Sequence, residues 1–289
     1  MSLGSAIVGW GRFVKLPHTV FALPFALLGV VYASLHARVT LRVVVLVTVA
    51  FTGARFAAMG FNRIVDRDID ALNPRTRGRE LPAGRLSVGA AGLSVAVASA
   101  VFVASAWLLN PLCFYLSPPA LAWILGYSYT KRLTHWSHLW LGASLAMAPA
   151  GGYLAVTGRW PDPWWTLPLI GLAVLTWVAG FDIFYALQDE QFDREHGLKS
   201  AVVRLGQGGA ILTAKVMHGL TVGLLFAFGW FAGFGALFYA GVIAAAAILT
   251  WEHRLVRPGD LSKVNTAFFT MNGVMSVVVV VFALADRLL

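Results

Sequence analysis

The segment Asn62-Arg-Ile-Val-Asp66-Arg-Asp-Ile-Asp70 directly follows a long apolar run, and Tyr185-Ala-Leu-Gln-Asp189-Glu-Gln-Phe-Asp193 repeats its design about 120 residues later. Residues four apart lie on one face of a helix, so each segment is predicted to present a single row of polar side chains. We call these rows the first ladder, which comprises Asn62, Asp66 and Asp70, and the second ladder, which comprises Asp189 and Asp193. Their position directly after apolar runs predicts that both lie at a membrane surface.

The ladder side chains are candidate metal ligands. Like charges four residues apart repel one another, and ionised carboxylates at a membrane boundary are costly. A divalent cation removes both penalties, and Mg2+ suits carboxylates while keeping positions open for phosphate oxygens. Two facing ladders therefore predict a diphosphate held through Mg2+, with these metal ligands: Asn62, Asp66, Asp70, Asp189 and Asp193. The alternative is a pair of solvated helix ends with ordinary loop charges.

The composition is that of a membrane protein. Of the 289 residues, 58% are hydrophobic and 12% are charged, against roughly 25% charged in soluble domains. Mean hydropathy is +0.74. Apolar stretches near the roughly 20 residues that span a bilayer recur along the chain. They predict nine transmembrane helices in one polytopic all-α membrane domain over residues 1–289, at about 18–35, 41–62, 88–108, 111–130, 138–157, 166–187, 209–231, 232–250 and 264–284.

Positive charge gathers on one side of the predicted membrane domain. The net charge is +9, and of the 22 Lys and Arg residues 17 fall at the N-terminus or in the loops after even-numbered spans. The positive-inside rule then places the N-terminus and both ladders on the cytoplasmic side of the cell membrane. This distribution favours a lipid bilayer, and not nucleic acid, as the partner. The stretch from Trp10 to Lys15 is predicted to be an amphipathic lead-in lying at the interface.

Two charged residues are predicted to lie deeper in the membrane than the ladders. Arg55 precedes Asn62 by seven residues, and Asp182 precedes Asp189 by seven, which is two helical turns, or roughly 10 Å, in each case. An arginine at that depth costs a few kcal/mol unless it is paired. One interpretation is therefore an internal ion pair between Arg55 and Asp182.

Further motifs accompany the two ladders in a fixed order along the chain. They are Asp70-Ala-Leu-Asn-Pro-Arg75-Thr, Leu81-Pro-Ala-Gly, Tyr127-Ser-Tyr-Thr-Lys131-Arg132, Asp182-Ile-Phe-Tyr185, and Asn265-Thr-Ala-Phe-Phe with Asn272-Gly. Together they resemble the UbiA superfamily of intramembrane prenyltransferases over essentially the whole chain. Lys15-Leu-Pro-His18-Thr and Tyr185-Ala-Leu-Gln-Asp189 are most similar to the 4-hydroxybenzoate polyprenyltransferase and menaquinone-type branch. Glu80 departs from the family pattern, which often has Pro there.

The resemblance implies a fold and a reaction. The fold is nine transmembrane helices around a central cavity, capped by two cytoplasmic loops at 63–87 and 188–208. In the reaction, a polyprenyl diphosphate loses its diphosphate with the help of Mg2+, and the allylic cation alkylates an aromatic acceptor such as 4-hydroxybenzoate, in quinone biosynthesis. Because water would quench the cation, a cavity within the bilayer suits this chemistry.

The resemblance also implies roles for individual side chains. Catalytic roles fall to Asp66, Asp70, Asp182, Asp189 and Asp193. Contacts to the diphosphate are expected from Asn62, Arg75, Lys131, Arg132 and, more weakly, Lys199. The acceptor pocket is expected to include Arg55, Tyr127 and Tyr185, with Arg55 facing the acceptor's carboxylate. The alternatives are membrane anchoring by the long basic side chains and ordinary packing by the tyrosines.

Other functions remain open at this stage. The acceptor is alternatively a glyceryl phosphate of ether-lipid synthesis, a tetrapyrrole, or a naphthoate of the menaquinone pathway. From a different class, a divalent-cation transporter would also need membrane carboxylates. Transporter sites lie near the bilayer midplane, however, whereas both ladders are expected at its edge, which argues against transport.

Overall fold

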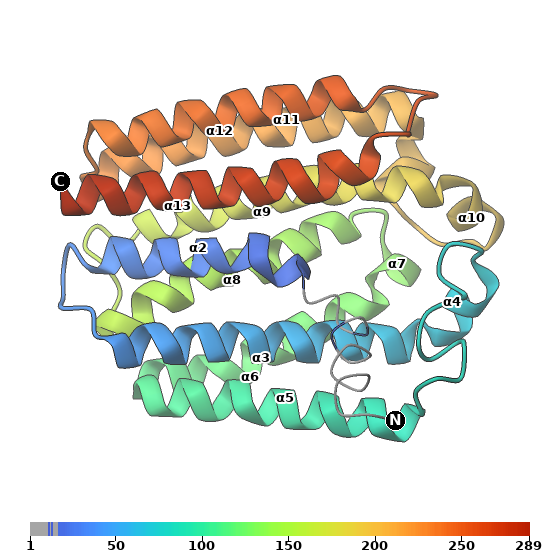
Figure 1. The fold of residues 1–289 in the computed structure, drawn as a ribbon, viewed down its shortest axis with the longest axis horizontal. Helices are drawn as coiled ribbons and strands as arrows, with labels where there is room; N and C mark the ends of the chain where they lie inside the picture. The colour runs from blue at the N-terminus through green and yellow to red at the C-terminus, as the bar shows by residue number, and fades with distance from the viewer. Residues whose placement is uncertain (1–10, 12, 14–16) are drawn as a thin grey trace.

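The long helices run side by side and form a single bundle (Figure 1). The computed structural model describes residues 11, 13 and 17–289. Most of the predicted lead-in from Trp10 to Lys15 and the side chain of His18 lie outside this part of the chain. In the described part there are nine long helices: α2 (Pro17–Ala33), α3 (Leu41–Val65), α5 (Val88–Leu109), α6 (Pro111–Gly126), α8 (Ser137–Thr157), α9 (Thr166–Ala186), α11 (Ala201–Ala232), α12 (Ala236–Leu255) and α13 (Asn272–Leu288).

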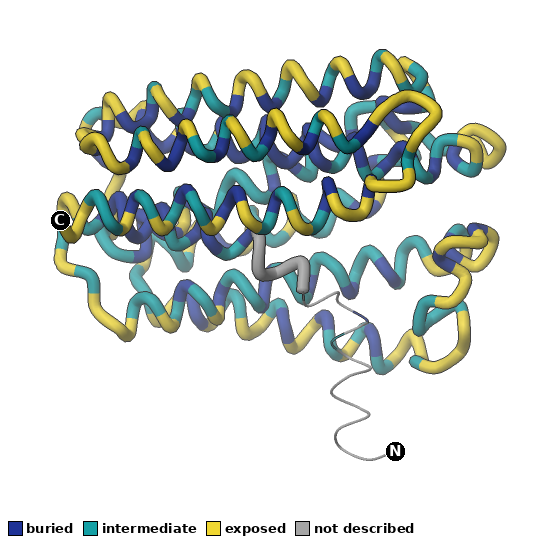
Figure 2. The backbone as a smooth tube through the Cα atoms, turned by 45° about the horizontal axis from the view of Figure 1, so that its top comes forward, coloured by how far each residue is buried: buried dark blue, intermediate teal, exposed yellow. Residues whose placement is uncertain are grey.

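The all-α multi-pass architecture predicted from the sequence is confirmed. Seven of the described helical segments are long and apolar enough to cross a membrane, whereas α2 and α6 are slightly shorter, with 17 and 16 residues. The side chains on the outer surface of the bundle are largely apolar, and Figure 2 shows exposed residues recurring along the outward faces of the helices. An apolar outer surface is what a bilayer solvates, so the chain is a multi-pass membrane protein.

Helix α9 is the central element of the bundle. Two thirds of its most apolar stretch is buried, while the corresponding stretches of the other spans are between 17% and 39% buried. Its Trp177 is fully buried and packs on Phe25 of α2 and on Phe181, with ring centroids 4.7 and 5.0 Å apart. A helix that is apolar all round belongs in the interior of the protein. Residues projecting from the end of α9 are therefore held by the best-packed part of the bundle.

Glycines allow the helices around α9 to approach closely. A Cβ at Gly29 of α2 would lie 2.0 Å from the carbonyl oxygen of Pro149 in α8, and one at Gly152 would lie 2.1 Å from that of Ala26. At Gly142, a Cβ would meet the carbonyl oxygen of Leu175 in α9 at 2.4 Å. Small residues at such crossings are how membrane helices gain packing energy without a hydrophobic driving force.

Short elements gather at one end of the bundle, which we call the motif end. They are α4 (Arg67–Leu72), η1 (Tyr127–Tyr129), α7 (Thr130–Leu133), η2 (Leu187–Asp189) and α10 (Glu190–Glu195), and α4, α7 and α10 lie together there (Figure 1). Both loops are shorter than expected. Helix α3 continues to Val65, and α11 begins at Ala201 because the Ser200 side chain caps it by accepting a hydrogen bond from the Val203 N–H at 3.2 Å.

Candidate active site

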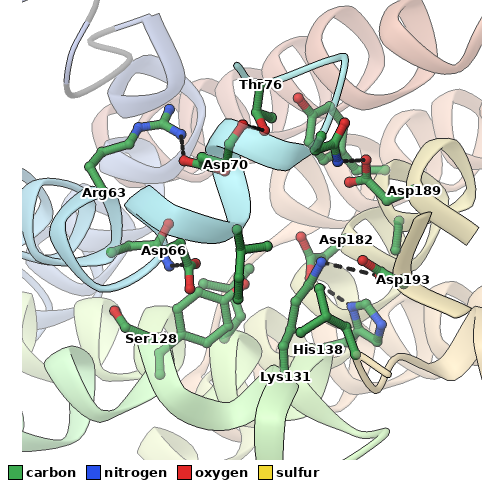
Figure 3. A pocket seen from close by; sticks show the side chains of 18 of the residues that line it. Arg63, Asp66, Asp70, Thr76, Ser128, Lys131, His138, Asp182, Asp189 and Asp193 are labelled. Carbon is green, nitrogen blue, oxygen red and sulfur yellow. Dashed lines mark hydrogen bonds and ion pairs between the residues drawn. The ribbon is translucent and has the colours of Figure 1, made fainter. Parts of the chain in front are cut away.

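A cavity of about 190 Å³ opens at the motif end, and nearly all the residues singled out in the sequence line it. They come from α3, α4, the segment after α6, α9, η2 and α10. Figure 3 shows Asp66 and Asp70 on one side of the cavity and Asp189 and Asp193 on the other. The lining includes Arg55, Asn62, Asp66, Asp70, Arg75, Tyr127, Lys131, Arg132, Asp182, Tyr185, Asp189 and Asp193.

The first ladder crosses a break between two helices. Helix α3 ends at Val65 and α4 starts at Arg67, because the Asp66 backbone leaves helical geometry with φ −94° and ψ 5°. The register nevertheless continues, since the Asp66 N–H donates to the Asn62 carbonyl at 2.9 Å and the Asp70 N–H donates to the Asp66 carbonyl at 2.7 Å. The Asn62 amide also donates to the Asp66 carboxylate at 2.8 Å. The four-residue spacing therefore brings the three side chains to one cavity wall, although not on one continuous helix.

The second ladder is more deeply buried. Asp189 ends the 3-10 turn η2 and is 6% exposed, and Asp193 lies in α10 and is 2% exposed. Asn73 and Arg75, both from the loop after the first ladder, donate to the Asp189 carboxylate at 3.2 and 2.9 Å. The two acidic motifs are thus tied together directly by side chains far apart in the sequence.

Each ladder carboxylate is paired with a basic side chain. Five such pairs among the described residues surround the cavity: Arg132 with Asp66 at 2.9 Å, Arg79 with Asp70 at 2.6 Å, Arg63 with Asp70 at 3.9 Å, Arg75 with Asp189, and Lys131 with Asp193 at 3.4 Å. Charge-assisted hydrogen bonds of this kind hold a buried carboxylate in one position. The pairing also brings the charges around the cavity close to electrical balance, at a place where unpaired charge would be costly.

Lys131 and Arg75 are charged groups poised beside the carboxylates. Burial lowers the pKa of Lys131, but the carboxylates of Asp193 and Asp189 outweigh it and raise that pKa above its ordinary value. For Arg75, burial likewise opposes the Asp189 carboxylate, which prevails and raises the pKa. Arg75 also donates to the Tyr185 hydroxyl at 3.0 Å. Both side chains therefore present full positive charge to any anion that enters the cavity.

Arg55 and Asp182 line the deeper part of the cavity, but the structure does not pair them. Asp182 instead accepts a hydrogen bond from His138 Nδ1 at 2.7 Å. The Nε atom of Arg55 is buried and has no hydrogen-bond partner among the described residues. The predicted internal pair is therefore wrong, because His138 of α8 approaches Asp182 in its place. Within the described part of the chain, Arg55 has no counter-ion and lines a cavity, which is the expensive arrangement that a bound anion would relieve.

Aromatic rings form another wall of the cavity. Tyr185 packs on Phe268 with ring centroids 4.4 Å apart, and Phe268 packs edge-on against Phe181 at 5.3 Å. Phe268 belongs to the π-helix η3 (Thr266–Met271), which precedes α13. A single wide turn of this kind often occurs at functional sites. Here it brings an aromatic side chain of α13's leading segment against the end of α9.

The donor set fits Mg2+. Among the described residues, no three His, Cys, Asp or Glu side chains converge into a metal cluster. Mg2+ does not need one, because it is usually held by one or two carboxylates and completes its coordination with water and phosphate oxygens. The four ladder carboxylates and the Asn62 amide line one cavity from two sides and supply oxygen ligands only. They are the residues that would hold the ion.

Several site residues were missed or misplaced from the sequence. Lys199 does not line the cavity, because its ammonium donates to the Leu133 carbonyl at 3.2 Å on the outside of α7. Arg63 and His138, in contrast, line the cavity and are 4% and 1% exposed. Arg63 looked like one more loop charge, and no spacing could have revealed a histidine that meets Asp182 across 44 residues of sequence.

The comparisons with known proteins agree with this geometry. The model of the UbiA prenyltransferase family matches residues 22–274. A 4-hydroxybenzoate octaprenyltransferase from Azotobacter vinelandii is 33% identical over 253 residues, which cover 87% of this chain and 84% of that protein. The structure of a UbiA homolog from Aeropyrum pernix K1 is similar with a TM-score of 0.85 and 35% identity, covering 94% of this chain and 98% of that one.

A more distant structure shares the fold. A UbiA homolog from Archaeoglobus fulgidus, solved bound to GPP and Mg2+, is similar with a TM-score of 0.70 and 20% identity, covering 97% of this chain and all of that one. The family match spans most of the sequence, and the curated relative passes 30% identity over most of its length. The fold, the two ladders and the cavity therefore have one explanation: the chain belongs to the UbiA prenyltransferase family.

Proposed function

We propose that this prenyltransferase transfers a polyprenyl group from a polyprenyl diphosphate to 4-hydroxybenzoate, with Mg2+ as cofactor, as a step of quinone biosynthesis. The relatives named 4-hydroxybenzoate octaprenyltransferase support this choice of acceptor, as the Archaeoglobus fulgidus homolog bound to GPP and Mg2+ supports the choice of donor and metal. The single observation that carries the proposal is a cavity with paired carboxylates at its mouth and, among its deeper residues, Arg55, whose buried Nε has no hydrogen-bond partner in the described part of the chain.

The mouth of the cavity suits the diphosphate. Mg2+, when bound by the ladders, supplies positive charge that stabilises the negative charge developing on the leaving diphosphate. Lys131 and Arg75 now donate to carboxylates, and their donor atoms can turn to phosphate oxygens once the carboxylates ligate an ion. Arg132 and Arg79 stand in the same relation to the first ladder. The basic side chains thus pair with carboxylates before the ligand binds and bind phosphate oxygens when the ligand is present.

The deeper part of the cavity suits an aromatic acid. The Arg55 guanidinium lies on α3 two turns before Asn62, so a carboxylate bound to it leaves the ring pointing toward the ladders. A 4-hydroxybenzoate ring in this place has its carboxylate at Arg55 and its hydroxyl-bearing end toward the diphosphate. This orientation brings the ring carbon beside the hydroxyl within reach of the prenyl C1.

The cavity walls protect the cationic prenyl group. Tyr185, Phe181 and Phe268 present aromatic rings, whose faces attract cations and exclude water. The long prenyl tail is insoluble in water, so the donor enters from the bilayer in which the apolar outer surface lies. Because the basic residues gather at the motif end, we also propose that this end, with both ladders, faces the cytoplasm.

An acceptor panel tests the proposal. The purified protein in detergent, supplied with geranyl diphosphate and Mg2+, is given 4-hydroxybenzoate, a dihydroxynaphthoate or glyceryl phosphate, and products are identified by mass spectrometry. We expect prenylated 4-hydroxybenzoate to predominate and EDTA to abolish it. Prenylated glyceryl phosphate alone would contradict the acceptor assignment, and product formation in EDTA would contradict the role of the metal. Asp68→Asn should leave the product yield unchanged, because Asp68 is an exposed carboxylate that pairs with Arg67 outside the cavity.

A further inference from the structure

One of the five acidic side chains that line the cavity differs from the others. The four ladder carboxylates pair with Arg or Lys, whereas Asp182 forms no ion pair with Arg or Lys among the described residues. Its partner is His138, a side chain that is 1% exposed. A carboxylate that is neither a metal ligand nor tied to a fixed cation keeps a lone pair available to accept a proton.

The geometry around His138 determines what the imidazole does. Its Nε2 lies 3.4 Å from the backbone N–H of Ala201, which donates to it, so the ring proton resides on Nδ1 and is donated to Asp182 at 2.7 Å. Ala201 is the first residue of α11, so the start of that helix fixes the Nε2 side of the ring. His138 therefore donates from Nδ1 and orients the Asp182 carboxylate.

Asp182 also lies at the depth where the acceptor ring is bound. Asp182 lies on α9 seven residues before Asp189 of η2, as Arg55 lies seven residues before Asn62 on α3, and both Asp182 and Arg55 line the cavity on the inner side of the ladders. An acceptor whose carboxylate binds Arg55 places its ring between this level and the ladders. The ladder carboxylates, which would hold the ion, are poorly available to the ring.

We propose that Asp182 is the base that removes the proton from the alkylated ring and that His138 is its positioning residue; this inference rests on the proposed function. In the reaction, the bond between the prenyl C1 and the diphosphate oxygen breaks, and the diphosphate leaves with the electron pair. The ring carbon beside the hydroxyl then forms a bond to C1, which interrupts the aromaticity of the ring. The hydrogen on that carbon leaves as a proton to an Asp182 carboxylate oxygen, and the electron pair of the C–H bond restores the aromatic ring.

Isotope substitution in the acceptor tests this assignment. With 4-hydroxybenzoate deuterated at both positions beside the hydroxyl, the wild type is expected to show no primary isotope effect, because proton loss follows the slower ionisation of the donor. Asp182→Asn should lower kcat about 100-fold or more, the range for loss of a general base, and make a primary isotope effect appear. Diphosphate binding with Mg2+, measured by calorimetry, should stay as in the wild type.

His138 provides the second variant. Its replacement by Leu removes the hydrogen bond to Asp182 and should also produce an isotope effect, whereas His138→Asn retains a side-chain N–H near the position of Nδ1 and should restore much of the lost rate. Wild-type turnover in Asp182→Asn, or a loss of turnover without any isotope effect, would overturn the assignment. A wild-type protein that forms no prenylated 4-hydroxybenzoate would instead contradict the proposed function itself, so the two failures are distinguishable.

Discussion

Two polar clusters lie inside this apolar bundle, and they are built on opposite principles. The cavity cluster is composed of Asp, Arg and Lys side chains arranged in ion pairs around an open space. The sealed cluster, which links α9, α11, α12 and α13 away from the cavity, is composed of Trp177, His218, Glu252, His253 and Asn272. The first can exchange its partners for a ligand, whereas the residues of the second do not line the cavity and bond to one another within the bundle.

The sealed cluster is held by one amide in particular. Asn272 accepts a hydrogen bond from the Trp177 indole at 2.6 Å and donates to Glu252 at 3.0 Å. The same amide donates to the carbonyls of Ala267 and Phe268, which belong to the π-helix. Asn272 thus satisfies backbone groups that the wide turn frees, and it ties the segment carrying Phe268 to the centre of the bundle.

Histidine completes the sealed cluster. His218 donates from Nε2 to the Trp177 carbonyl at 3.3 Å, and its Nδ1 lies 3.0 Å from His253 Nε2. Gly180 is required here, since a Cβ at that position would lie 2.3 Å from the His218 ring. The comparison teaches that buried polarity serves binding where ion pairs surround a cavity, and serves structure where hydrogen bonds link helices inside the bundle.

Loss of a ladder carboxylate should have the largest effect. Asp66→Asn or Asp189→Asn should lower turnover about 10²–10³-fold, because each weakens the stabilisation of charge on the leaving group. Thermal unfolding, followed by circular dichroism in detergent, should change little. Glu190→Gln is the matched control, since Glu190 lies on α10 but pairs with the exposed Arg194. Robust activity in either aspartate variant would remove the basis for a two-ladder site.

The second-largest effect is expected for Arg55→Ala, and its size should differ between acceptors. Loss of the partner of a buried carboxylate costs about 2–5 kcal/mol, so kcat/KM for 4-hydroxybenzoate should fall much more than for a neutral phenol of the same size. Steady-state kinetics with both acceptors measures the difference. Equal losses with the charged and the neutral acceptor would show that Arg55 does not recognise the carboxylate. The assignment of prenyl transfer itself would still stand.

Lys131→Ala and Arg75→Ala should act on the other substrate. Each removes a hydrogen bond to a charged group, worth about 1.5–3 kcal/mol, so the KM for the prenyl diphosphate should rise while the KM for the acceptor changes little. Arg194→Ala, which removes an exposed arginine from α10, is the control. A change confined to the acceptor's KM would mean that the two residues belong to the acceptor pocket.

The smallest effect on catalysis, but a clear one on stability, is expected in the sealed cluster. Asn272→Leu removes one hydrogen bond each from the Trp177 N–H, a Glu252 oxygen and two carbonyls, and should destabilise the fold by about 1–3 kcal/mol. Thermal denaturation of the detergent-solubilised protein measures it. Binding of diphosphate with Mg2+ should remain at the wild-type level. A variant as stable as the wild type, with binding lost, would reverse the distinction between the two clusters.

The sequence alone predicted the all-α fold and most of the residues that line the cavity. Apolar runs located the nine long helices of the described residues, and the four-residue spacing brought Asp66 and Asp70 to one wall even though the helix breaks at Asp66. Tertiary pairing could not be foreseen in the same way. The contact of Arg75 with Asp189 joins residues 114 positions apart, and His138 displaces Arg55 as the partner of Asp182. Such pairings depend on how helices pack, which periodicity does not encode.

The most direct test of the central claim is the binding of inorganic diphosphate to the detergent-solubilised protein, measured by calorimetry with Mg2+ and with EDTA. The basic side chains at the mouth of the cavity are engaged by the ladder carboxylates, so a bare diphosphate finds few free cations there. We therefore expect binding that requires Mg2+ and that Asp189→Asn weakens strongly. Equal binding in EDTA, or binding with Mg2+ that Asp189→Asn leaves unchanged, would contradict a diphosphate site held through the two ladders.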